Sequence, residues 1–415
     1  MSVIMLLLLL EDQPIKQTEI FLVYRIDEIK LSADIKDLLE DLDRLNIIHV
    51  SGTKGKGSTC AFSESLLREL NSNNNKSTPK NSLNSNVVIK TGLFTSPHMV
   101  EVRERIQING APISKDIFSK YFFEVWNRIA SIEELATIDG DNALTNRIVN
   151  KPKKVDIPYF GFLTLLAFHV FMKENVNAAI FEVGIGGEFD LTNVIRNPIV
   201  CGITSIGIDH TQILGSKIQD IALQKAGIMK KDSIAYTLDH QKEIVLDVFK
   251  KVALERTCKL VILPTPNRFY NDEQLEANLG GKHQILNSIL AVNLVCEWVK
   301  RTSFFTKEDL CLALNAPESS TSDVWPEWVF KALFATKWPG RSHHFTTPEY
   351  PNIHWYLDGA HTADSLTLCT DWFLKNTSHN SNNPCILLFS LSCGRDKISN
   401  LESLAKLVKD YRPID

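Results

Sequence analysis

Residues 51–59, Ser-Gly-Thr-Lys-Gly-Lys-Gly-Ser-Thr, form a glycine- and lysine-rich stretch between two regular elements. The apolar residues 45–50 before it predict a buried strand, and residues 60–70 after it predict a helix. A glycine-rich turn between a strand and a helix lets backbone N–H groups converge on an anion, and the helix N-terminus adds positive potential. We therefore interpret this stretch as a phosphate-binding loop rather than an ordinary glycine turn.

The side chains of the loop suggest separate roles. Lys56 can reach the terminal phosphates of a nucleotide, and the Ser58 hydroxyl can coordinate a magnesium ion. The spacing departs from the common Walker A pattern, because only two residues separate Gly52 from Gly55 and Gly57 stands before Ser58. The expected phosphate-binding residues are Gly52, Thr53, Lys54, Gly55, Lys56, Gly57, Ser58 and Thr59.

Composition describes an ordinary globular protein of two or three domains, with 415 residues, 44% hydrophobic and 23% charged. A net charge of -4 is not the excess of positive charge that is typical of nucleic-acid-binding proteins. The eight cysteines include no C-x-x-C pair, which favours a reduced compartment over a zinc site or a disulfide framework. The apolar run 5–10 is too short to span a membrane and lacks the basic start of a secretory signal. We expect a cytoplasmic monomer, with mitochondria as a second location left open.

Strand and helix patterns alternate along the chain, which predicts a parallel α/β sheet with ligands at the carboxyl ends of its strands. Asn109-Gly110 is a strong tight-turn signal. The polar residues 71–86 predict a flexible surface insertion, and residues 131–155 a loop. A strand that leads into a loop is expected at 87–98; the other expected strands are 103–108, 178–183 and 199–208, and the expected helices are 114–129 and 159–174.

A break rich in Trp, Pro and Ser at residues 321–339 precedes a second, smaller α/β unit. Its expected strands are 353–357 and 384–390, and its expected helices are 364–375 and 401–409. About 77 residues follow Trp338, whereas a complete α/β domain more often has about 100–150. We therefore expect this unit to be incomplete.

Acidic and basic residues stand at several predicted strand ends. Glu182 ends a strand and enters a glycine-rich run, where it could hold magnesium or face solvent in a turn. His210, after Asp209 at another strand end, is as compatible with a hydrogen-bonded structural histidine as with a metal ligand. Lys225, judged from its helix alone, is more consistent with a surface lysine than with a catalytic group.

Arg341 lies at the break between the units, and Asp358 and His361 follow a predicted strand of the second unit. These side chains could close on a phosphate from across a cleft. A turn that carries surface charges is an equal alternative.

Together these motifs resemble the folylpolyglutamate synthase family, in the folate branch of the Mur ligase superfamily, and more closely its eukaryotic type. The resemblance runs from about residue 45 to the C-terminus. It is carried by residues 49–59, 95–98, 102–110, 121–126, 181–188, 207–210, 339–341 and 358–361.

The resemblance implies a P-loop ATPase domain and a Rossmann-like C-terminal domain with a cleft between them. We place these domains at residues 1–337, with 71–86 as the insertion, and 338–415. In this family Lys56 and the loop amides would hold ATP, and Ser96, Glu182 and His210 would be the magnesium positions. Lys225 resembles a lysine that is carbamylated there. His283, Gln284 and Asn287 resemble the nucleotide-side segment, and Arg341, Asp358 and His361 would close on ATP.

The activity implied is ATP-dependent addition of L-glutamate to the terminal glutamate carboxylate of folate through an acyl phosphate, with Mg²⁺ and a monovalent cation such as K⁺. The expected small-molecule partners are folate and glutamate. Dihydrofolate synthase, or a catalytically silent paralogue that binds folate or a protein partner, are the alternatives. The chain departs from the family in the segment before residue 45, in the insertion at 71–86 and in the short second domain.

Overall fold

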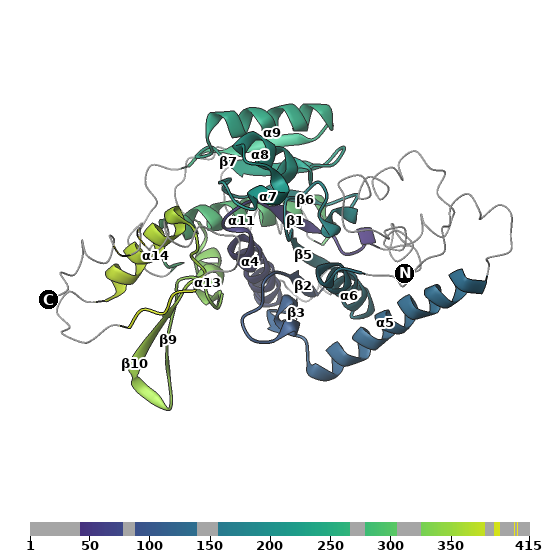
Figure 1. Ribbon diagram of the computed structural model, residues 1–415, viewed down its shortest axis with the longest axis horizontal. Helices are drawn as coiled ribbons and strands as arrows, with labels where there is room; N and C mark the ends of the chain where they lie inside the picture. Colours follow the sequence, from purple (N-terminus) through teal and green to yellow (C-terminus); the bar gives the residue numbers. More distant parts are fainter. Residues whose placement is uncertain are drawn as a thin grey trace.

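A mostly parallel eight-stranded sheet forms the centre of the computed structural model (Figure 1). The structure describes residues 42–77, 88–138, 157–265, 279–304, 325–377, 386–390, 402 and 405. Within them the strand order is β4-β3-β2-β5-β1-β6-β7-β8. The strands are β1 Ile48–Ser51, β2 Thr91–Phe94, β3 Ile106–Ile108, β4 Ala111–Pro112, β5 Ala178–Glu182, β6 Val200–Ile203, β7 Ile234–Leu238 and β8 Lys259–Leu263.

The strand β1 lies between β5 and β6, and all three run parallel. Val50 is in register with Glu182, and Ser51 with Ile203, so the ends of these strands meet at one edge of the sheet. In the described part of this sheet, the antiparallel pairs are β2 with β3 and β3 with β4. Asn109 and Gly110 between them have φ of 51° and 77°, which confirms the predicted tight turn.

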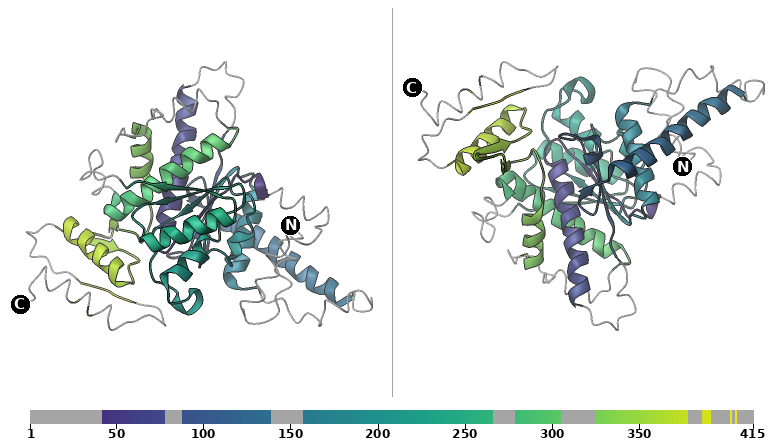
Figure 2. Two further views of the ribbon diagram at one scale, coloured as in Figure 1. Left: turned by 90° about the horizontal axis from the view of Figure 1, so that it is seen from above. Right: turned by 90° about the horizontal axis from the view of Figure 1, so that it is seen from below.

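Helices cover both faces of the sheet, as Figure 2 shows. The helices in the described part of the chain are α4 Lys56–Ser77, α5 Lys115–Ile138, α6 Tyr159–Lys173, α7 Thr211–Leu214, α8 Ile218–Ala226, α9 Glu243–Glu255, α11 Lys282–Arg301, α13 Glu327–Ala335 and, away from the sheet, α14 Ala363–Asn376, with 3-10 turns η2 Val102–Arg105 and η4 Leu191–Val194. None of these helices is long and apolar enough to cross a bilayer, within the described ranges.

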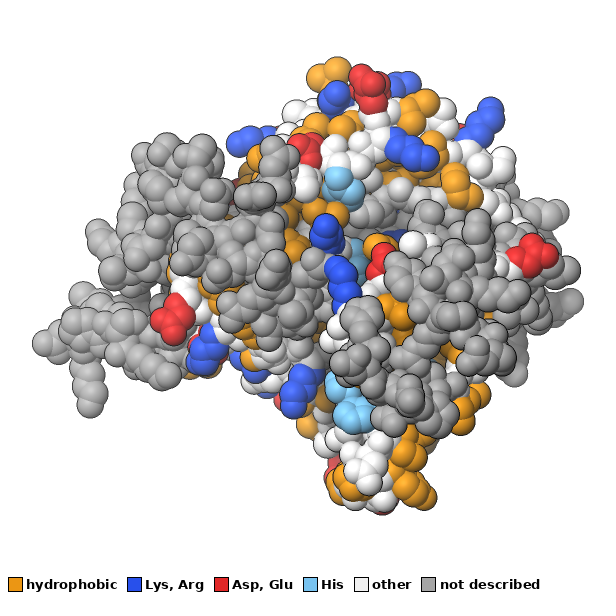
Figure 3. All heavy atoms as spheres, turned by 90° about the vertical axis from the view of Figure 1, so that its left-hand side faces the viewer, with side chains coloured by type: hydrophobic (Ala, Val, Ile, Leu, Met, Phe, Trp, Pro, Cys, Tyr) orange, Lys and Arg blue, Asp and Glu red, His pale blue; other side chains and the backbone are white. Residues whose placement is uncertain are grey.

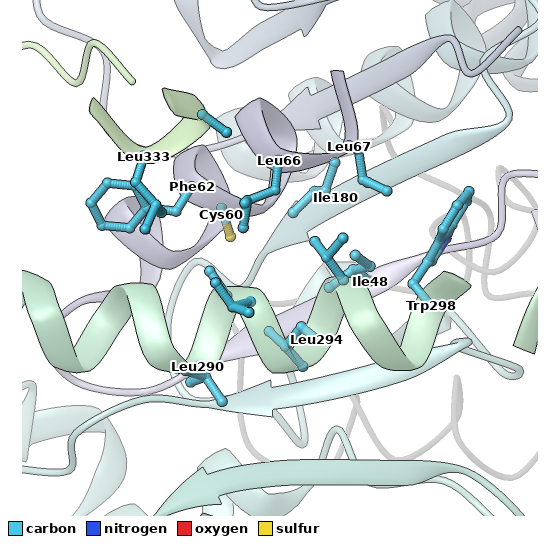
Figure 4. Close-up of a cluster of buried hydrophobic side chains, with 14 of the residues drawn as sticks. Ile48, Cys60, Phe62, Leu66, Leu67, Ile180, Leu290, Leu294, Trp298 and Leu333 are labelled. Atoms are coloured by element: carbon cyan, nitrogen blue, oxygen red, sulfur yellow. The ribbon is translucent and has the colours of Figure 1, made fainter. Parts of the chain in front are cut away.

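Alternate residues of the central strands enter different cores. Ile48 of β1 and Ile180 of β5 pack with Leu290 and Trp298 of α11, against α4 (Figure 4). Phe181 of β5 faces the opposite way and joins the core under α6. Both faces are therefore buried, which explains why most residues of these strands are apolar.

Several boundaries differ from the sequence predictions. α4 continues to Ser77, so the first residues of the expected insertion are helical, while 78–87 lie outside the described residues. α5 likewise runs to Ile138, and 139–156 are not described. β6 ends at Ile203, earlier than expected. The Thr204 amide still donates to Ser51 at the end of β1, but the Ser205 carbonyl accepts from Thr53 and Lys54 in the loop after β1.

The second unit, as far as it is described, differs in its strands from those expected at 353–357 and 384–390. β9 His343–Thr347 and β10 Tyr350–Leu357 form an antiparallel hairpin that extends away from the large sheet in Figure 1, and α14 follows. Residues 386–390 form no strand, contrary to prediction, whereas α14 confirms the helix predicted at 364–375. Of the helix predicted at 401–409, only 402 and 405 are described, and both are helical.

The predicted break at 321–339 contains α13, which packs on α4 through the buried Leu333. Ser65 of α4 also donates a hydrogen bond to the Ala332 carbonyl at 2.8 Å. The apolar spacing of Val329, Ala332 and Leu333 is the helical signal that the Trp and Pro residues obscured. Residues up to Ala335 therefore pack with the large sheet, and the division of the chain at residue 337 stays a prediction.

We expect Leu290→Ala to lower the free energy of unfolding by about 2–5 kcal/mol, because Leu290 is fully buried between α11 and the sheet and its loss leaves a cavity. Urea denaturation followed by circular dichroism measures the change. Leu223→Ala on α8, where the side chain is 52% exposed, is the matched control and should change it little. Equal effects of the two substitutions would contradict this packing.

Candidate active site

The loop between β1 and α4 is fastened to the segment that follows β6. The Thr53 and Lys54 amides donate to the Ser205 carbonyl at 2.9 and 3.2 Å. The Thr53 hydroxyl also bonds the Gly207 amide and carbonyl, both at 3.1 Å. These contacts fix the loop at the carboxyl end of the sheet, where parallel α/β sheets bind ligands.

Two glycines of this loop have no room for a side chain. Gly52 has φ of 143°, and a Cβ there would lie 1.8 Å from Thr204 Oγ1. Gly55 has φ of 93°, and a Cβ there would lie 2.1 Å from Asn287 Oδ1 on α11. Backbone alone can thread between the end of β6 and α11, which explains the glycines at these two positions.

The first turn of α4 directs backbone donors out of the helix. The turn closes with the Thr59 amide donating to the Gly55 carbonyl at 2.9 Å. The backbone amides of residues 56–58, before Thr59, have no acceptor within the helix, and their N–H groups point outward at the N-terminus of α4. Together with the Lys56 ammonium they form a cradle for an anion.

Glu182 lies beside this cradle at the end of β5, with 4% of its surface exposed. Its Oε2 accepts a hydrogen bond from the Ser96 amide at 2.9 Å. Burial raises the pKa of Glu182, while the charges of Lys56 and Arg341 and the Ser96 amide act in the opposite direction. A cation bound here would favour the ionised carboxylate.

The three expected metal positions are not equally placed. Ser96 and Glu182 are in contact, whereas His210 is exposed at the N-cap of α7 with φ of 51°. In the described part of the chain, no three His, Cys, Asp or Glu side chains form a cluster that could hold a metal ion. A cation at Glu182 would therefore need other oxygen ligands, such as a hydroxyl or phosphate.

Lys225 is buried, so the expectation of a surface lysine is wrong. Its side chain is 3% exposed, and its Nζ donates to the Gly52 carbonyl at 2.7 Å. Burial, with the charge of Lys56 in support, lowers the pKa of Lys225 to about 7, although Asp209 and Asp190 oppose this shift. The sequence held a signal for it, because Lys225 lies three and four residues after the buried Ala222 and Ile221.

Lys54 does not direct its ammonium at the anion cradle. The Nζ atom lies 2.9 Å from His361 Nε2 in the second unit and 3.6 Å from Asp209 Oδ2. Partial burial raises the pKa of Asp209, but His361 and the charge of Lys54 outweigh burial and hold that pKa well below its usual range. The backbone of Lys54 belongs to the loop, while its side chain contacts the second unit.

Arg341, just before β9, and Asp358, just after β10, lie on two segments of the second unit that contact each other. Asp358 accepts hydrogen bonds from the Ser342 and Ala360 amides at 2.7 and 2.8 Å, so its carboxylate holds the turn. The Arg341 Nη1 donates to the Gly340 carbonyl at 2.9 Å and lies so close to Gly359 that a Cβ there would be 2.2 Å away. Figure 3 shows Lys, Arg and His side chains gathered along the middle of the face on which this unit lies.

The N-terminal turn of α11 lies between the loop and the second unit. Asn287 is 6% exposed, and its Nδ2 donates to Gln284 Oε1 at 3.0 Å. Burial lowers the pKa of His283, and the charge of Asp358 opposes that shift. Ser342 donates to the Gly280 carbonyl at 2.9 Å, which joins this turn to the second unit.

The sequence analysis did not identify two residues, Gln241 and Asp190, whose hydrogen bonds fix segments next to the site. The Gln241 side chain accepts from the Ile206 amide and donates to the Thr204 carbonyl, both at 3.0 Å. It thereby fixes residues 204–206, to which the loop is hydrogen-bonded. Asp190 accepts from the Ile185 amide and from Thr192, and so fixes the glycine turn after Glu182. Their positions just after strands were the available signal.

Curated relatives share sequence with most of the chain, although no protein-family model matches it. Mitochondrial folylpolyglutamate synthase of Homo sapiens is 41% identical over 389 residues, which are 90% of this chain and 59% of the relative. A probable folylpolyglutamate synthase of Schizosaccharomyces pombe is 40% identical over 367 residues, 88% of this chain and 64% of the relative. The chain thus spans about three fifths of the length of these relatives.

Solved structures share the fold at lower sequence identity. The apo form of L. casei FPGS has a TM-score of 0.60 and 24% identity, covering 88% of this chain and 81% of that one. An FPGS-AMPPCP-folate complex has a TM-score of 0.59 and 23% identity, with the same coverage. The α/β fold and the sequence similarity agree: the chain is similar in sequence to folylpolyglutamate synthases and shares its fold with the solved structures named above.

Proposed function

We propose that this protein adds L-glutamate to the terminal glutamate carboxylate of folate, with ATP as the energy source. One observation carries the proposal: the backbone cradle at the start of α4 lies beside the buried Glu182 and within reach of the turn that holds Arg341. The names of the relatives indicate this activity in related proteins, and one solved neighbour is titled as a complex with AMPPCP and folate.

In this proposal, the loop holds the phosphates of ATP. The amides at the start of α4 and the Lys56 ammonium neutralise phosphate charge, and Gly52 and Gly55 allow the close approach of the backbone. Asn287 and the N-terminal turn of α11 form the adjacent wall. Ordered donors of this kind contribute to catalysis because they need no reorganisation when charge develops.

Magnesium fits the donors at the end of β5. The Glu182 carboxylate and the Ser96 hydroxyl are hard oxygen ligands, and His210 is the third proposed position. When bound, Mg²⁺ neutralises charge on the phosphates. A monovalent cation such as K⁺ is also part of the proposal.

The reaction follows from the poor reactivity of a carboxylate. A folate carboxylate oxygen attacks the γ-phosphorus of ATP, the bond to ADP breaks, and an acyl phosphate forms. The amine of glutamate then attacks the acyl carbon, the bond to phosphate breaks, and the amine loses a proton. Phosphoryl transfer of this kind requires mainly positioning and charge neutralisation, which Lys56 and Arg341 would supply.

Lys225 has a separate proposed role. A lysine with a pKa of about 7 is largely uncharged at slightly alkaline pH, and an uncharged amine can take up carbon dioxide to form a carbamate. The carbamate would convert a buried cation beside the loop into an anion.

The names of the human and bovine relatives include mitochondria, so we keep the cytoplasm and mitochondria both as proposed locations.

We expect the purified chain to incorporate radiolabelled glutamate into tetrahydrofolate and to release ADP only when ATP and magnesium are present. Lys56→Ala should reduce this turnover ~10²–10³-fold, because its charge stabilises the transferred phosphoryl group. The control is Lys217→Ala, at an exposed lysine before α8, which should keep wild-type turnover.

Thermal melting checks that Lys56→Ala remains folded. Undiminished ADP release by folded Lys56→Ala would contradict the phosphate-binding role of the loop. Glutamate incorporation into dihydropteroate but not into tetrahydrofolate would replace the proposed substrate and leave the chemistry in place.

We expect Lys225 to form a carbamate that is detected by carbon-13 NMR in labelled bicarbonate. At pH 8 a lysine with a pKa of about 7 is mostly uncharged, whereas an ordinary lysine is almost entirely charged. The carbamate signal should grow as pH rises through about 7 and be absent in Lys225→Met. A signal that persists in Lys225→Met would assign the modification to another amine.

A further inference from the structure

The side chain of Lys54 crosses from the loop to the second unit. Its backbone amide is fixed by the Ser205 carbonyl at 3.2 Å, so the start of the side chain has a defined position. Its Nζ reaches His361 Nε2 at 2.9 Å, the distance of a direct hydrogen bond. The contact therefore joins the loop to the turn before α14.

The tautomer of His361 follows from its other nitrogen. His361 Nδ1 lies 2.6 Å from the Gly359 carbonyl, and a carbonyl only accepts, so Nδ1 carries a proton. In the neutral ring Nε2 is then an acceptor, which suits the Lys54 ammonium. Asp209 Oδ2 lies 3.5–3.6 Å from both groups and supplies the countercharge.

This cluster differs from an ordinary surface ion pair. The side chains of Lys54, Asp209 and His361 are only 36%, 14% and 25% exposed. Exposed pairs contribute little because water screens them and both side chains lose freedom. Here the partners are partly shielded, and three chain segments meet at one point.

His361 is part of the turn that contains Asp358, another expected ATP-binding residue of the second unit. The His361 and Thr362 amides both donate to the Ser365 hydroxyl, at 3.0 and 2.9 Å, and so connect the turn to α14. The same turn contains Asp358 and the Gly359 backbone against which Arg341 lies. Fixing the imidazole of His361 therefore restrains the whole turn.

We propose that Lys54 is a positioning residue that fastens the turn at residues 358–362 to the phosphate loop and thereby holds Arg341 and His361 at the nucleotide site. Its ammonium acts on the second unit, and its contribution to phosphate binding comes from its backbone. The catalytic meaning of this tether rests on the proposed ligase function, whereas the tether itself does not.

Hydrogen exchange of the full chain, measured by mass spectrometry on peptides covering residues 355–366, tests the tether without any assay of activity. Lys54→Met keeps the side-chain length and removes the charge and the donor. We expect exchange in these peptides to rise about tenfold, because the turn opens locally more often. Peptides from β1 and α9 should exchange as in the wild type and serve as the internal reference.

Two further variants separate the tether from a general loss of stability. Lys54→Arg retains a cationic donor and should keep exchange near the wild-type rate. His361→Leu removes the other partner, and its effect on residues 358–362 should not add to that of Lys54→Met. Lys217→Met, at an exposed lysine of the large unit, is the matched control and should change nothing.

Calorimetric titration with ADP gives the second readout, and we expect any loss of ADP affinity in Lys54→Met to accompany the rise in exchange at residues 355–366. Wild-type exchange in residues 355–366 of Lys54→Met would overturn the tether. A tenfold loss of ADP affinity at unchanged exchange would instead make the Lys54 ammonium a phosphate ligand. If the chain ligates no glutamate, the exchange result still decides the tether, and the proposed function alone fails.

Discussion

The close approach of bare backbone at Gly52 and Gly55 determines how the site is built. A Cβ at either residue would meet Thr204 or Asn287 at about 2 Å, so the loop can pass between the end of β6 and α11 only without side chains. This passage brings the first turn of α4 next to Glu182 and buries Lys225 against the Gly52 carbonyl. The close packing of the loop therefore determines the positions of the α4 amides, of Glu182 and of Lys225 relative to one another.

The large sheet and the second unit contribute to the site in different ways. The sheet supplies rigid strand ends, because β1, β5 and β6 are in register and buried on both faces. Two contacts between the second unit and the loop are those of Trp338 with Gly57 and of His361 with Lys54. Trp338 lies so close to Gly57 that a Cβ at this glycine would be 2.9 Å from the indole ring. The position of the second unit over the loop is consequently the part of the site that single substitutions can change most easily.

The sequence predicted what is encoded locally. The strand, loop and helix predicted at residues 45–70, the Asn109-Gly110 turn and α6 each have a composition or period that indicates one structure, and all three are confirmed, with α4 longer than predicted. Lys225 was misplaced because a lone lysine in an amphipathic helix suggests solvent, whereas α8 packs that face on the loop. The Lys54–His361 contact joins distant segments, and no local pattern encodes such a pairing.

The most direct test of this account is calorimetric titration of the purified chain with ADP in the presence of magnesium, alongside Gly55→Ala. The account predicts saturable binding at one site in the wild type and loss of that binding in Gly55→Ala, because the added methyl must displace Asn287 and strain a backbone with φ of 93°. Thermal melting should show both proteins folded. Equal ADP affinity in the two proteins, or no binding by the folded wild type, would contradict the assignment of this loop as the nucleotide site.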